Sequence, residues 1–516
     1  MSRPPAPAPW RLIAVVHLLA SLALLAWIAM AQQPTALPDA GGQRIRCVSY
    51  SPFYRPGLSP LDAAAHVSPD EIRSDLAALA AMTGCVRTYA VNQGLDAVPD
   101  AARALGMEVL LGAWIGRDPA ANAREVERVI ELANAYPGTV RGVVVGNEVL
   151  LRGEQDAEAL ARWLGRVRAG VRVPVTYADV WEFWLRHPEL AASVDFVTIH
   201  ILPFWEDQPV GVVQAVEHVA DIRRQVADRF GKPILIGETG WPSEGRQREG
   251  AAPGRVAEAR FVRELLLRAN REGWDYNLIE AFDQPWKRRL EGTVGGHWGI
   301  LDVTGNAKFP LDGPLSERAG WGLPLLTALL GAVLLVLVAL GRRRPPAQCL
   351  AWGLVGLWGG LCGGMAIEHA QVAWRDAREA LVLGGVLCLG PLWLLLAAAG
   401  VPGRWREGLR MVILFCAATA ALWLAVDPRY RDFPWWLYAG VAPALALIRP
   451  ETDRRSSGLL AMVLVIAGVA RAVPEPGNPE ALGWLVLCLL LAAGGWPPRE
   501  QQEGEQGGDG GGFHVV

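Results

Sequence analysis

The stretch KPILIGETGWPSEG, residues 232–245, joins a buried strand to a polar end. Residues 233–237 form an apolar run of the kind that fills the middle of a parallel sheet. Glu238 follows this run at once, and Trp241 and Pro242 stand behind it as a large aromatic and a rigid turn. The stretch therefore predicts a parallel strand whose carboxyl end carries a functional carboxylate.

Short apolar runs separated by amphipathic helices repeat from residue 43 to residue 283. Eight strands are predicted, at 45–52, 85–90, 108–115, 140–148, 173–179, 195–201, 233–238 and 276–283. Strands that alternate with helices in this number predict an α/β fold, the (β/α)8 or TIM barrel. An open doubly wound sheet is the alternative. That fold usually carries a glycine-rich phosphate turn after its first strand, and SYSPFYRPG (49–57) is not such a turn.

The composition divides the 516 residues into a soluble part and two strongly apolar parts. We predict an N-terminal signal anchor at 1–31, the barrel at 32–320, and an all-α membrane domain of about seven transmembrane helices at 321–496. Residues 497–516 are rich in Gly, Gln and Glu, which predicts a disordered cytoplasmic tail. A cleaved signal peptide is the alternative for the first segment.

The C-terminal part contains seven candidate spans, at 321–340, 349–367, 379–399, 409–426, 433–448, 457–473 and 480–496, of which 433–448 is short and rich in tryptophan. Every second connection is rich in arginine, at 342–344, 404–410 and 449–455. The positive-inside rule places these connections and both termini in the cytoplasm. The sequence thus predicts a multi-pass protein of the inner (cytoplasmic) membrane, with the lipid bilayer as partner and residues 32–320 facing the periplasm.

Charge and cysteine usage exclude several classes of protein. A net charge of −3 without a visible basic face argues against a nucleic-acid partner. No pair of histidines has the i,i+4 spacing of metal ligands and no phosphate-binding loop occurs, so no metal and no cofactor are expected. Cys47 and Cys85 are the two cysteines of the exported part. The compartment allows a bridge between them, but the sequence leaves the pairing open.

The carboxyl ends of the strands form the active-site face of a barrel. The predicted strand ends and the residues just beyond them are rich in aromatic and carboxylate side chains; they include Tyr50, Arg87, Tyr89, Asn147, Glu148, Tyr177, His200, Glu238, Trp241, Trp286 and Lys287. Aromatic faces pack on sugar rings, and a pair of carboxylates can cleave an acetal. The fourth and seventh strands lie on opposite sides of a barrel, so Glu148 and Glu238 can face each other across a substrate.

Two stretches, VVVGNEV (143–149) and ILIGETGWPS (234–243), resemble the signatures of glycoside hydrolase family 17. The resemblance covers roughly 43–312, and TIHILPFWED (198–207) and EAFDQPWKR (280–288) are similar to its bacterial, membrane-attached branch. It implies that Glu148 is the acid/base and Glu238 the nucleophile of a retaining mechanism, with carboxyl groups about 5–5.5 Å apart. The charge of Glu238 is expected to raise the pKa of Glu148.

By this resemblance, the substrate is a β-glucan oligo- or polysaccharide whose β-1,3-glucosidic bonds are cleaved by hydrolysis or transglycosylation. The residues expected to bind it are Asn147, Tyr50, Tyr89, Tyr177, His200, Trp241, Trp286 and Lys287, with Arg87 in support. Two departures from the plant members affect subsite geometry: His200 replaces a Tyr, and Gln284 replaces a Glu.

Other roles stay open for several of these residues. Trp241 and Trp286 can be rim packing, Lys287 a surface charge and His200 a core histidine. A membrane glucan synthase or exporter is a further expected partner. The alternative function is a catalytically silent carbohydrate-binding or assembly subunit of a glucan-export complex.

Overall fold

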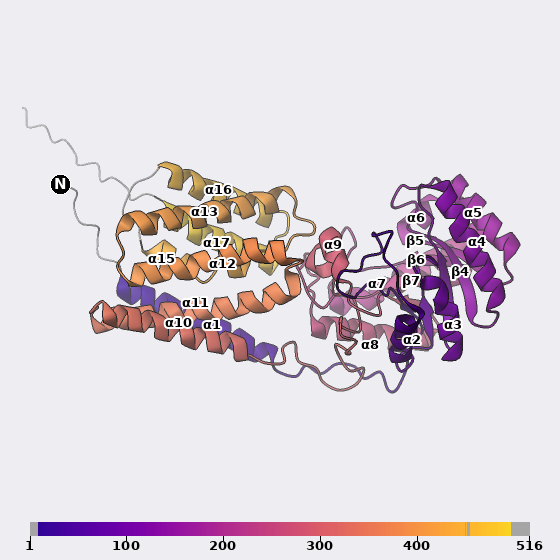
Figure 1. Ribbon diagram of the computed structural model, residues 1–516, viewed down its shortest axis with the longest axis horizontal. Helices are drawn as coiled ribbons and strands as arrows, with labels where there is room; N and C mark the ends of the chain where they lie inside the picture. The colour runs from indigo at the N-terminus through magenta and orange to yellow at the C-terminus, as the bar shows by residue number, and fades with distance from the viewer. Residues whose placement is uncertain (1–8, 449, 451–454, 497–516) are drawn as a thin grey trace, which may run out of the picture.

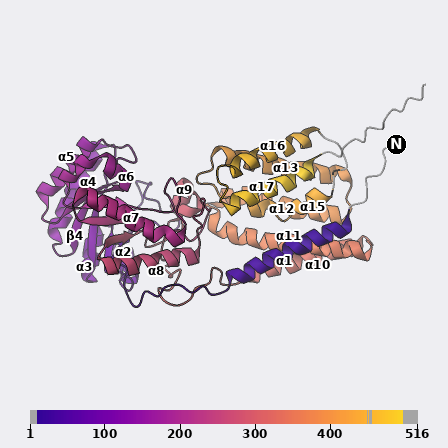
Figure 2. The ribbon, with the colours of Figure 1, turned by 180° about the vertical axis from the view of Figure 1, so that it is seen from behind.

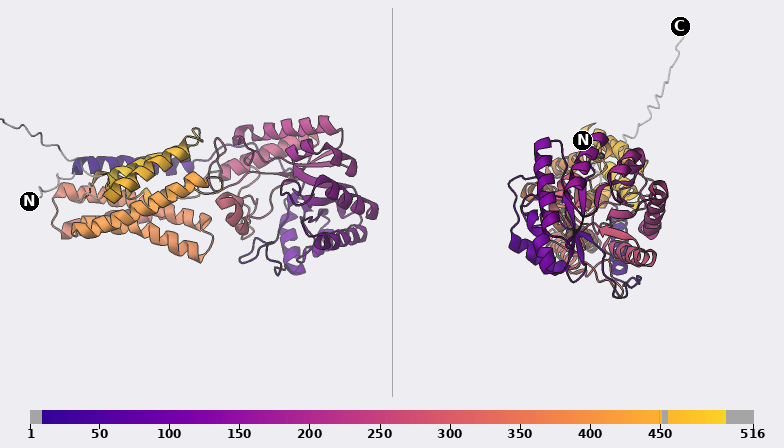
Figure 3. Two further views of the ribbon diagram at one scale, coloured as in Figure 1. Left: turned by 90° about the horizontal axis from the view of Figure 1, so that it is seen from above. Right: turned by 90° about the vertical axis from the view of Figure 1, so that its right-hand side faces the viewer.

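A computed structural model describes residues 9–448, 450 and 455–496. Within these residues the chain forms two parts that lie end to end along the long axis of the molecule, a barrel and a helical region (Figure 1). Figure 3 shows the same arrangement from above. The predicted tail at 497–516 lies outside the described residues.

The sheet is a closed barrel in which each strand pairs with its neighbours in the order of the sequence. All of these pairings are parallel. The strands are β1 Val48–Ser49, β2 Cys85–Arg87, β3 Glu108–Ala113, β4 Val140–Asn147, β5 Val175–Val180, β6 Val197–His200, β7 Ile234–Thr239 and β8 Asp275–Leu278. Each overlaps a predicted run. The TIM-barrel prediction is therefore confirmed, and the open-sheet alternative is wrong.

Helices surround this barrel and pack their apolar faces on the outer face of the strands. They are α2 Pro69–Leu79, α3 Val98–Ala104, α4 Pro119–Ala135, α5 Ala157–Gly170, α6 Trp181–Arg186, α7 Val212–Phe230 and α8 Arg255–Glu272, with 3-10 turns at Leu95–Ala97, Pro188–Ser193 and Pro285–Lys287. A further helix, α9 Arg288–Gly295, lies between the barrel and the helical region (Figure 1). Helix α2 begins with a capping box, in which Ser68 and Glu71 satisfy each other's backbone N–H groups. Val143 and Val145 of β4 belong to the core between strands and helices, whereas Val144 belongs to a separate interior cluster.

The interior cluster of the barrel contains a disulfide bond between Cys47 and Cys85. The bridge joins the start of β1 to the start of β2 and packs with Leu110, Val144 and Leu235. It closes a sequence separation of 38 residues. A bridge over a loop of this size stabilises a fold by about 3–4 kcal/mol. The pairing that the sequence left open is thus present.

The helical region is built from helices that run along the long axis of the molecule (Figure 2). They are α1 Trp10–Ala31, α10 Gly322–Gly341, α11 Pro346–Ala373, α12 Ala377–Ala398, α13 Gly403–Val426, α14 Trp435–Tyr438, α15 Ala442–Leu447, α16 Arg455–Ala472 and α17 Pro479–Gly495. Among the described residues, five helices are long and apolar enough to cross a membrane, namely α1 and α10 to α13. The last two, α16 and α17, are apolar but shorter.

The segment expected to span as one helix at 433–448 is instead broken. Helices α14 and α15 are separated by residues 439–441, and Pro443 stands in the first turn of α15. A proline has no backbone N–H and cannot continue a preceding helix, which gives the break a physical cause. The segment nevertheless runs from the barrel end, where Arg246 lies over Phe433, to the opposite end, where Arg410 donates to the Ile448 carbonyl.

The connections of the helical region alternate between its two ends. The three connections poorer in arginine, α11–α12, α13–α14 and α16–α17, contact the barrel through Trp374, Tyr430 and Asn478. At the opposite end, Arg410 donates to the backbone of Leu445, Ile448 and Gly494, which joins three chain segments there. This alternation agrees with the two sides predicted from the positive-inside rule; the crossing of a bilayer remains a prediction.

Candidate active site

The two carboxylates singled out by the sequence meet at the mouth of the barrel. Glu238 lies near the carboxyl end of β7, and Glu148 follows β4 directly. One oxygen of each carboxylate and one ring nitrogen of His200 all lie within 4.8 Å of one another. The Glu238 side chain is 7% exposed and that of Glu148 is 23% exposed, so both lie largely out of bulk water.

The turn after β4 aims Glu148 into this mouth. Gly146 has a φ of 86°, and a Cβ at that position would lie 2.6 Å from Cγ2 of Val149. Glu148 itself has a φ of 53°, a region that residues other than glycine rarely adopt. The Tyr177 hydroxyl accepts a hydrogen bond from the Leu150 amide at 3.0 Å, which holds the turn in place. Tyr177 therefore positions Glu148.

His200 lies between the two carboxylates. Its Nδ1 donates to Oε1 of Glu148 at 2.9 Å, and its Nε2 is 3.7 Å from Oε1 of Glu238. Gly237 gives the imidazole its space, because a Cβ there would lie 2.5 Å from Cγ2 of Thr198 and 3.1 Å from Cδ2 of His200. At Gly146 of GNE and Gly237 of GET, a larger residue would therefore clash with neighbouring side chains.

Strand β2 and the residues just after it supply the groups that hold Glu238. Arg87 Nη1 lies 3.3 Å from Oε1 of Glu238 and donates to the Gly237 carbonyl at 2.7 Å. The Tyr89 hydroxyl donates to the same Oε1 at 2.9 Å. The other end of the Arg87 guanidinium donates to Oδ1 of Asn147. Arg87 therefore connects the ends of β4 and β7 and fixes the orientation of the carboxylate.

The electrostatics of Glu148 differ from the sequence expectation. Burial raises the pKa of its carboxyl, but the hydrogen bond from His200 and the nearby cation Arg152 hold that pKa below its ordinary value. The expected rise caused by the charge of Glu238 is therefore wrong in this geometry. The physical reason is that an imidazole N–H, and not open space, separates the two carboxylates.

Replacing His200 with Phe should move the alkaline limb of the pH profile. The change removes the hydrogen bond to Glu148 and leaves its burial in place, so the pKa of Glu148 rises. A general acid is needed in its protonated form, so kcat/KM falls as pH rises through this pKa, and the fall moves to higher pH by about one unit. His187→Phe, a change at an exposed histidine, is the matched control. An alkaline limb that stays in place or moves to lower pH would contradict the assignment.

Other residues expected in the site are placed differently. Tyr50 is 1% exposed and its hydroxyl donates to Asp75 at 2.7 Å. Trp241 is also 1% exposed; its indole N–H donates to the Ala252 carbonyl, and its ring packs on Phe204. Both side chains are packing residues in this structure, and their expected contact with substrate is not supported by their burial.

Two residues beyond β8 lie partly open at the rim. The indole of Trp286 donates to Oε1 of Gln284 at 2.8 Å. Lys287 pairs with the buried Glu280 at 2.7 Å, which makes it more than a surface charge. Burial raises the pKa of Glu280 to about 7 even though the positive charge of Lys287 opposes that rise. Substrate binding by Trp286 and Lys287 stays a prediction.

Two acidic groups near the pair were not among the expected site residues. Burial raises the pKa of Asp179 to about 6, and the negative charge of Glu148 adds to that rise. Glu291 lies in α9, and its pKa is raised by burial and also by the charges of Glu148 and Glu238. Asp179 stands at a strand end and was open to detection there. No strand pattern points to Glu291, because this residue lies in helix α9 and not at the end of a strand.

The three-residue cluster also has the donor set of a metal site. Glu148, His200 and Glu238 offer ligand atoms close enough to hold an ion. However, Arg87 places its positive charge 3.3 Å from the same Glu238 oxygen, which repels a cation. We interpret the cluster as an acid–base arrangement.

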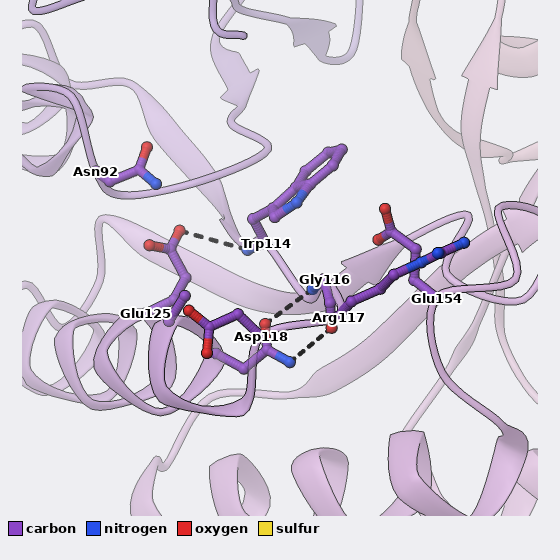
Figure 4. A pocket seen from close by; sticks show the side chains of 9 residues that line it. Asn92, Trp114, Gly116, Arg117, Asp118, Glu125 and Glu154 are labelled. Atoms are coloured by element: carbon purple, nitrogen blue, oxygen red, sulfur yellow. Dashed lines mark hydrogen bonds between the residues drawn. The ribbon is translucent and has the colours of Figure 1, made fainter. Parts of the chain in front are cut away.

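A pocket of about 340 Å³ lies beside the mouth, at the carboxyl end of β3 (Figure 4). Its lining includes Trp114, Arg117 and Glu154. Trp114 is 38% exposed, and the guanidinium of Arg152 lies 4.1 Å from its ring centroid. Arg152 also donates to the Asn147 carbonyl, which links the pocket to the turn that carries Glu148.

Comparison with known proteins agrees with this chemistry. Residues 47–299 match the family described as the BtgE/BtgC glycoside hydrolase domain. The match spans every strand of the barrel and both carboxylates. The barrel is a glycoside hydrolase or transglycosylase domain. The whole helical region lies outside the match, because α1 precedes it and the helices from α10 onward follow it.

Several relatives are fungal proteins. The glucan 1,3-beta-glucosidase of Saccharomyces cerevisiae is 26% identical over 274 residues, 48% of this chain and 86% of that protein. The Schizosaccharomyces pombe protein of the same name is 28% identical over 315 residues, 57% of this chain and 96% of that protein. A solved β-1,3-glucanosyltransferase of glycoside hydrolase family 17 from Rhizomucor miehei is 27% identical, covering 52% of this chain and 97% of that one, with a TM-score of 0.46.

Proposed function

We propose that the chain is a membrane-anchored, retaining enzyme that cleaves β-1,3-glucosidic bonds of a β-glucan. The observation that carries the mechanism is the approach of Glu148 and Glu238, whose oxygens lie within 4.8 Å. Inverting glycosidases keep their carboxyl groups about 6.5–9.5 Å apart to admit a water, and retaining ones about 5–5.5 Å apart. The names of the fungal glucan 1,3-beta-glucosidases support the substrate class.

The geometry gives each carboxylate a role. Among the described residues, the polar contacts of Glu238 with Arg87, Tyr89 and His200 all use Oε1, so Oε2 is the oxygen that attacks the anomeric carbon. Glu148 donates its proton to the departing glucosyl oxygen as that bond breaks. The resulting glycosyl-enzyme on Glu238 is released when Glu148 removes a proton from the acceptor hydroxyl.

The acceptor decides between hydrolysis and transglycosylation. Water gives shorter products, and a sugar hydroxyl gives transferred, longer ones, with the same two carboxylates in both reactions. The catalytically silent alternative is disfavoured because both carboxylates are present and held by Arg87, Tyr89 and His200.

Membrane attachment rests on the helical region and its charge pattern. Five described helices are long and apolar enough to cross a bilayer. The arginine-poor connections face the barrel, which supports an exported barrel above an inner membrane. We infer membership in the bacterial, membrane-attached branch of glycoside hydrolase family 17 from the stretches at 198–207 and 280–288.

The size of the helical region also motivates a partner. It exceeds what tethering needs, and we infer that it docks beside a membrane glucan synthase or exporter. Purification from native membranes without any such protein would count against this inference.

The enzymatic proposal is tested with the full-length protein in detergent and laminari-oligosaccharides as substrate. Products with the β anomeric configuration at the first moment of reaction, seen by proton NMR, support retention. Longer products indicate transfer, and shorter products alone indicate hydrolysis. An α anomer as first product would overturn the retaining mechanism, and no reaction at all would favour the silent alternative.

A further inference from the structure

The helical region contacts the barrel mainly at its catalytic mouth. The barrel contributes Trp205, Arg246, Gln247, Arg288 and Thr293, which all follow the carboxyl ends of β6, β7 or β8. On the other side are the α11–α12, α13–α14 and α16–α17 connections and the helix ends next to them, at Val372 of α11 and Glu480 of α17. Since the carboxyl ends of the strands surround the active site, these connections cover one side of it.

The α13–α14 connection, residues 427–434, reaches the mouth of the barrel. Gly292 of α9 has a φ of 72°, and a Cβ at that position would lie 1.8 Å from the carbonyl oxygen of Tyr430. The backbone of Tyr430 therefore rests directly on Gly292. Helix α9 follows the carboxyl end of β8, so this contact places Tyr430 at the mouth of the barrel, the face that carries Glu148 and Glu238.

Buried polar contacts fix this connection on both sides of Tyr430. Arg246 is 4% exposed, donates to the carbonyls of Pro428 and Arg429, and pairs with Glu475. Beyond Tyr430, Thr293 donates to the Asp432 carboxylate. A loop held in this way loses little conformational freedom when a ligand binds, which favours a binding role.

The side chain of Tyr430 extends an aromatic surface of the barrel. It is 37% exposed, and its ring packs edge-on against Trp205 at 5.6 Å between centroids. Trp205 follows His200 by five residues and stacks on Trp298 at 6.3 Å. Guanidinium groups of Arg248 and Arg429 lie over Trp205 and Tyr430. Partly exposed aromatic rings beside arginine donors suit a sugar ring and its hydroxyls.

We propose that the α13–α14 connection forms one wall of the substrate groove and that Tyr430 stacks on a glucosyl unit of the bound β-glucan. The inference rests on the proposed function. In this proposal the bound glucan extends from the Trp114 pocket beside β3, past Glu148 and Glu238, to Tyr430. The helical region thereby helps to set how many sugar units bind on its side of the cleaved bond.

The test compares Tyr430→Ala with the unchanged full-length protein in detergent, using laminari-oligosaccharides of increasing length. We expect KM for the longest substrates to rise about tenfold, with little change for the shortest, because one aromatic contact is lost. Tyr430→Phe should keep the original KM. Gly292→Ala should resemble Tyr430→Ala, because its methyl group displaces the Tyr430 backbone. Trp405→Ala, an exposed aromatic at the opposite end, is the matched control.

Binding to the inactive Glu238→Gln protein separates this inference from the proposed function. Tyr430→Ala in that background should weaken the affinity for a long oligosaccharide about tenfold. Binding without turnover by the unchanged protein would count against the enzymatic proposal. The comparison of affinities with and without Tyr430→Ala would then still decide whether Tyr430 contacts the glucan. A Tyr430→Ala protein with unchanged KM and unchanged affinity would overturn the wall. An equal effect of Trp405→Ala would overturn it too, and the absence of both binding and turnover would overturn both proposals.

Discussion

Replacing Glu238 with Gln is expected to lower kcat on laminari-oligosaccharides by at least about 10³-fold. The amide keeps the shape of the side chain and its position between Arg87 and Tyr89, but its oxygen is too weak a nucleophile to form the glycosyl-enzyme. Substrate affinity should change little, because the lost interaction develops in the transition state. The measurement is single-turnover and steady-state kinetics on purified full-length protein.

The control is Glu206→Gln, the same change at a carboxylate that bonds Trp181 and His218. It should keep nearly full turnover. In a Glu238→Ala protein, added azide can enter the vacated space and attack the anomeric carbon itself. With an activated aryl glucoside this should give an α-glucosyl azide. Full activity of Glu238→Gln, or a β-glucosyl azide from Glu238→Ala, would remove Glu238 as nucleophile.

The barrel could be predicted because its signal is local. Each strand is a short apolar run, each helix has an apolar face, and the two carboxylates follow glycine-bearing strand ends that resemble a known pair of motifs. Those features depend on residues close together in the chain. The positions of Glu148 and Glu238 follow from the closed eight-strand order, and so they were open to prediction as well.

The role of His200 depends on strand register, which the sequence does not display. The pairing of β6 with β7 shifts between Ile199 and His200, so that His200 pairs with Glu238 instead of Gly237. A bulge of this kind re-aims a side chain near an active site. Because the sequence does not reveal this bulge, it could not predict that the His200 imidazole lies between the two carboxylates or that it lowers the pKa of Glu148.

Aromatic residues were the other weak point of the prediction. A tyrosine or tryptophan at a strand end looks the same in the sequence whether it faces a sugar or fills the core. Tyr50 and Trp241 turned out to be buried, whereas Trp114 and Tyr430 are partly exposed. Tyr430 lies far from the barrel in sequence, and only the long-range contact with Trp205 brings it to the mouth.

Replacing Glu148 with Gln should produce a different failure from that of Glu238→Gln. Turnover of laminari-oligosaccharides should fall by about 10²–10⁴-fold, because the departing sugar oxygen no longer receives a proton. An aryl glucoside with an acidic leaving group needs little protonation, so its first cleavage should stay fast. The glycosyl-enzyme on Glu238 then accumulates, because no base activates the water.

The measurement is the release of the phenol leaving group over time. We expect a rapid burst of phenol, equal in amount to the enzyme, followed by a slow steady rate. Azide should restore that steady rate in a Glu148→Ala protein and give a β-glucosyl azide, since it attacks the covalent intermediate and not the substrate. The configuration of the azide product thus distinguishes the two carboxylates independently of how much activity each variant loses. A Glu148→Gln protein without a burst, or an α-glucosyl azide from Glu148→Ala, would show that the acid/base role belongs to another group. The nearest candidate would then be Asp179, which is buried beside Glu148 with a pKa of about 6.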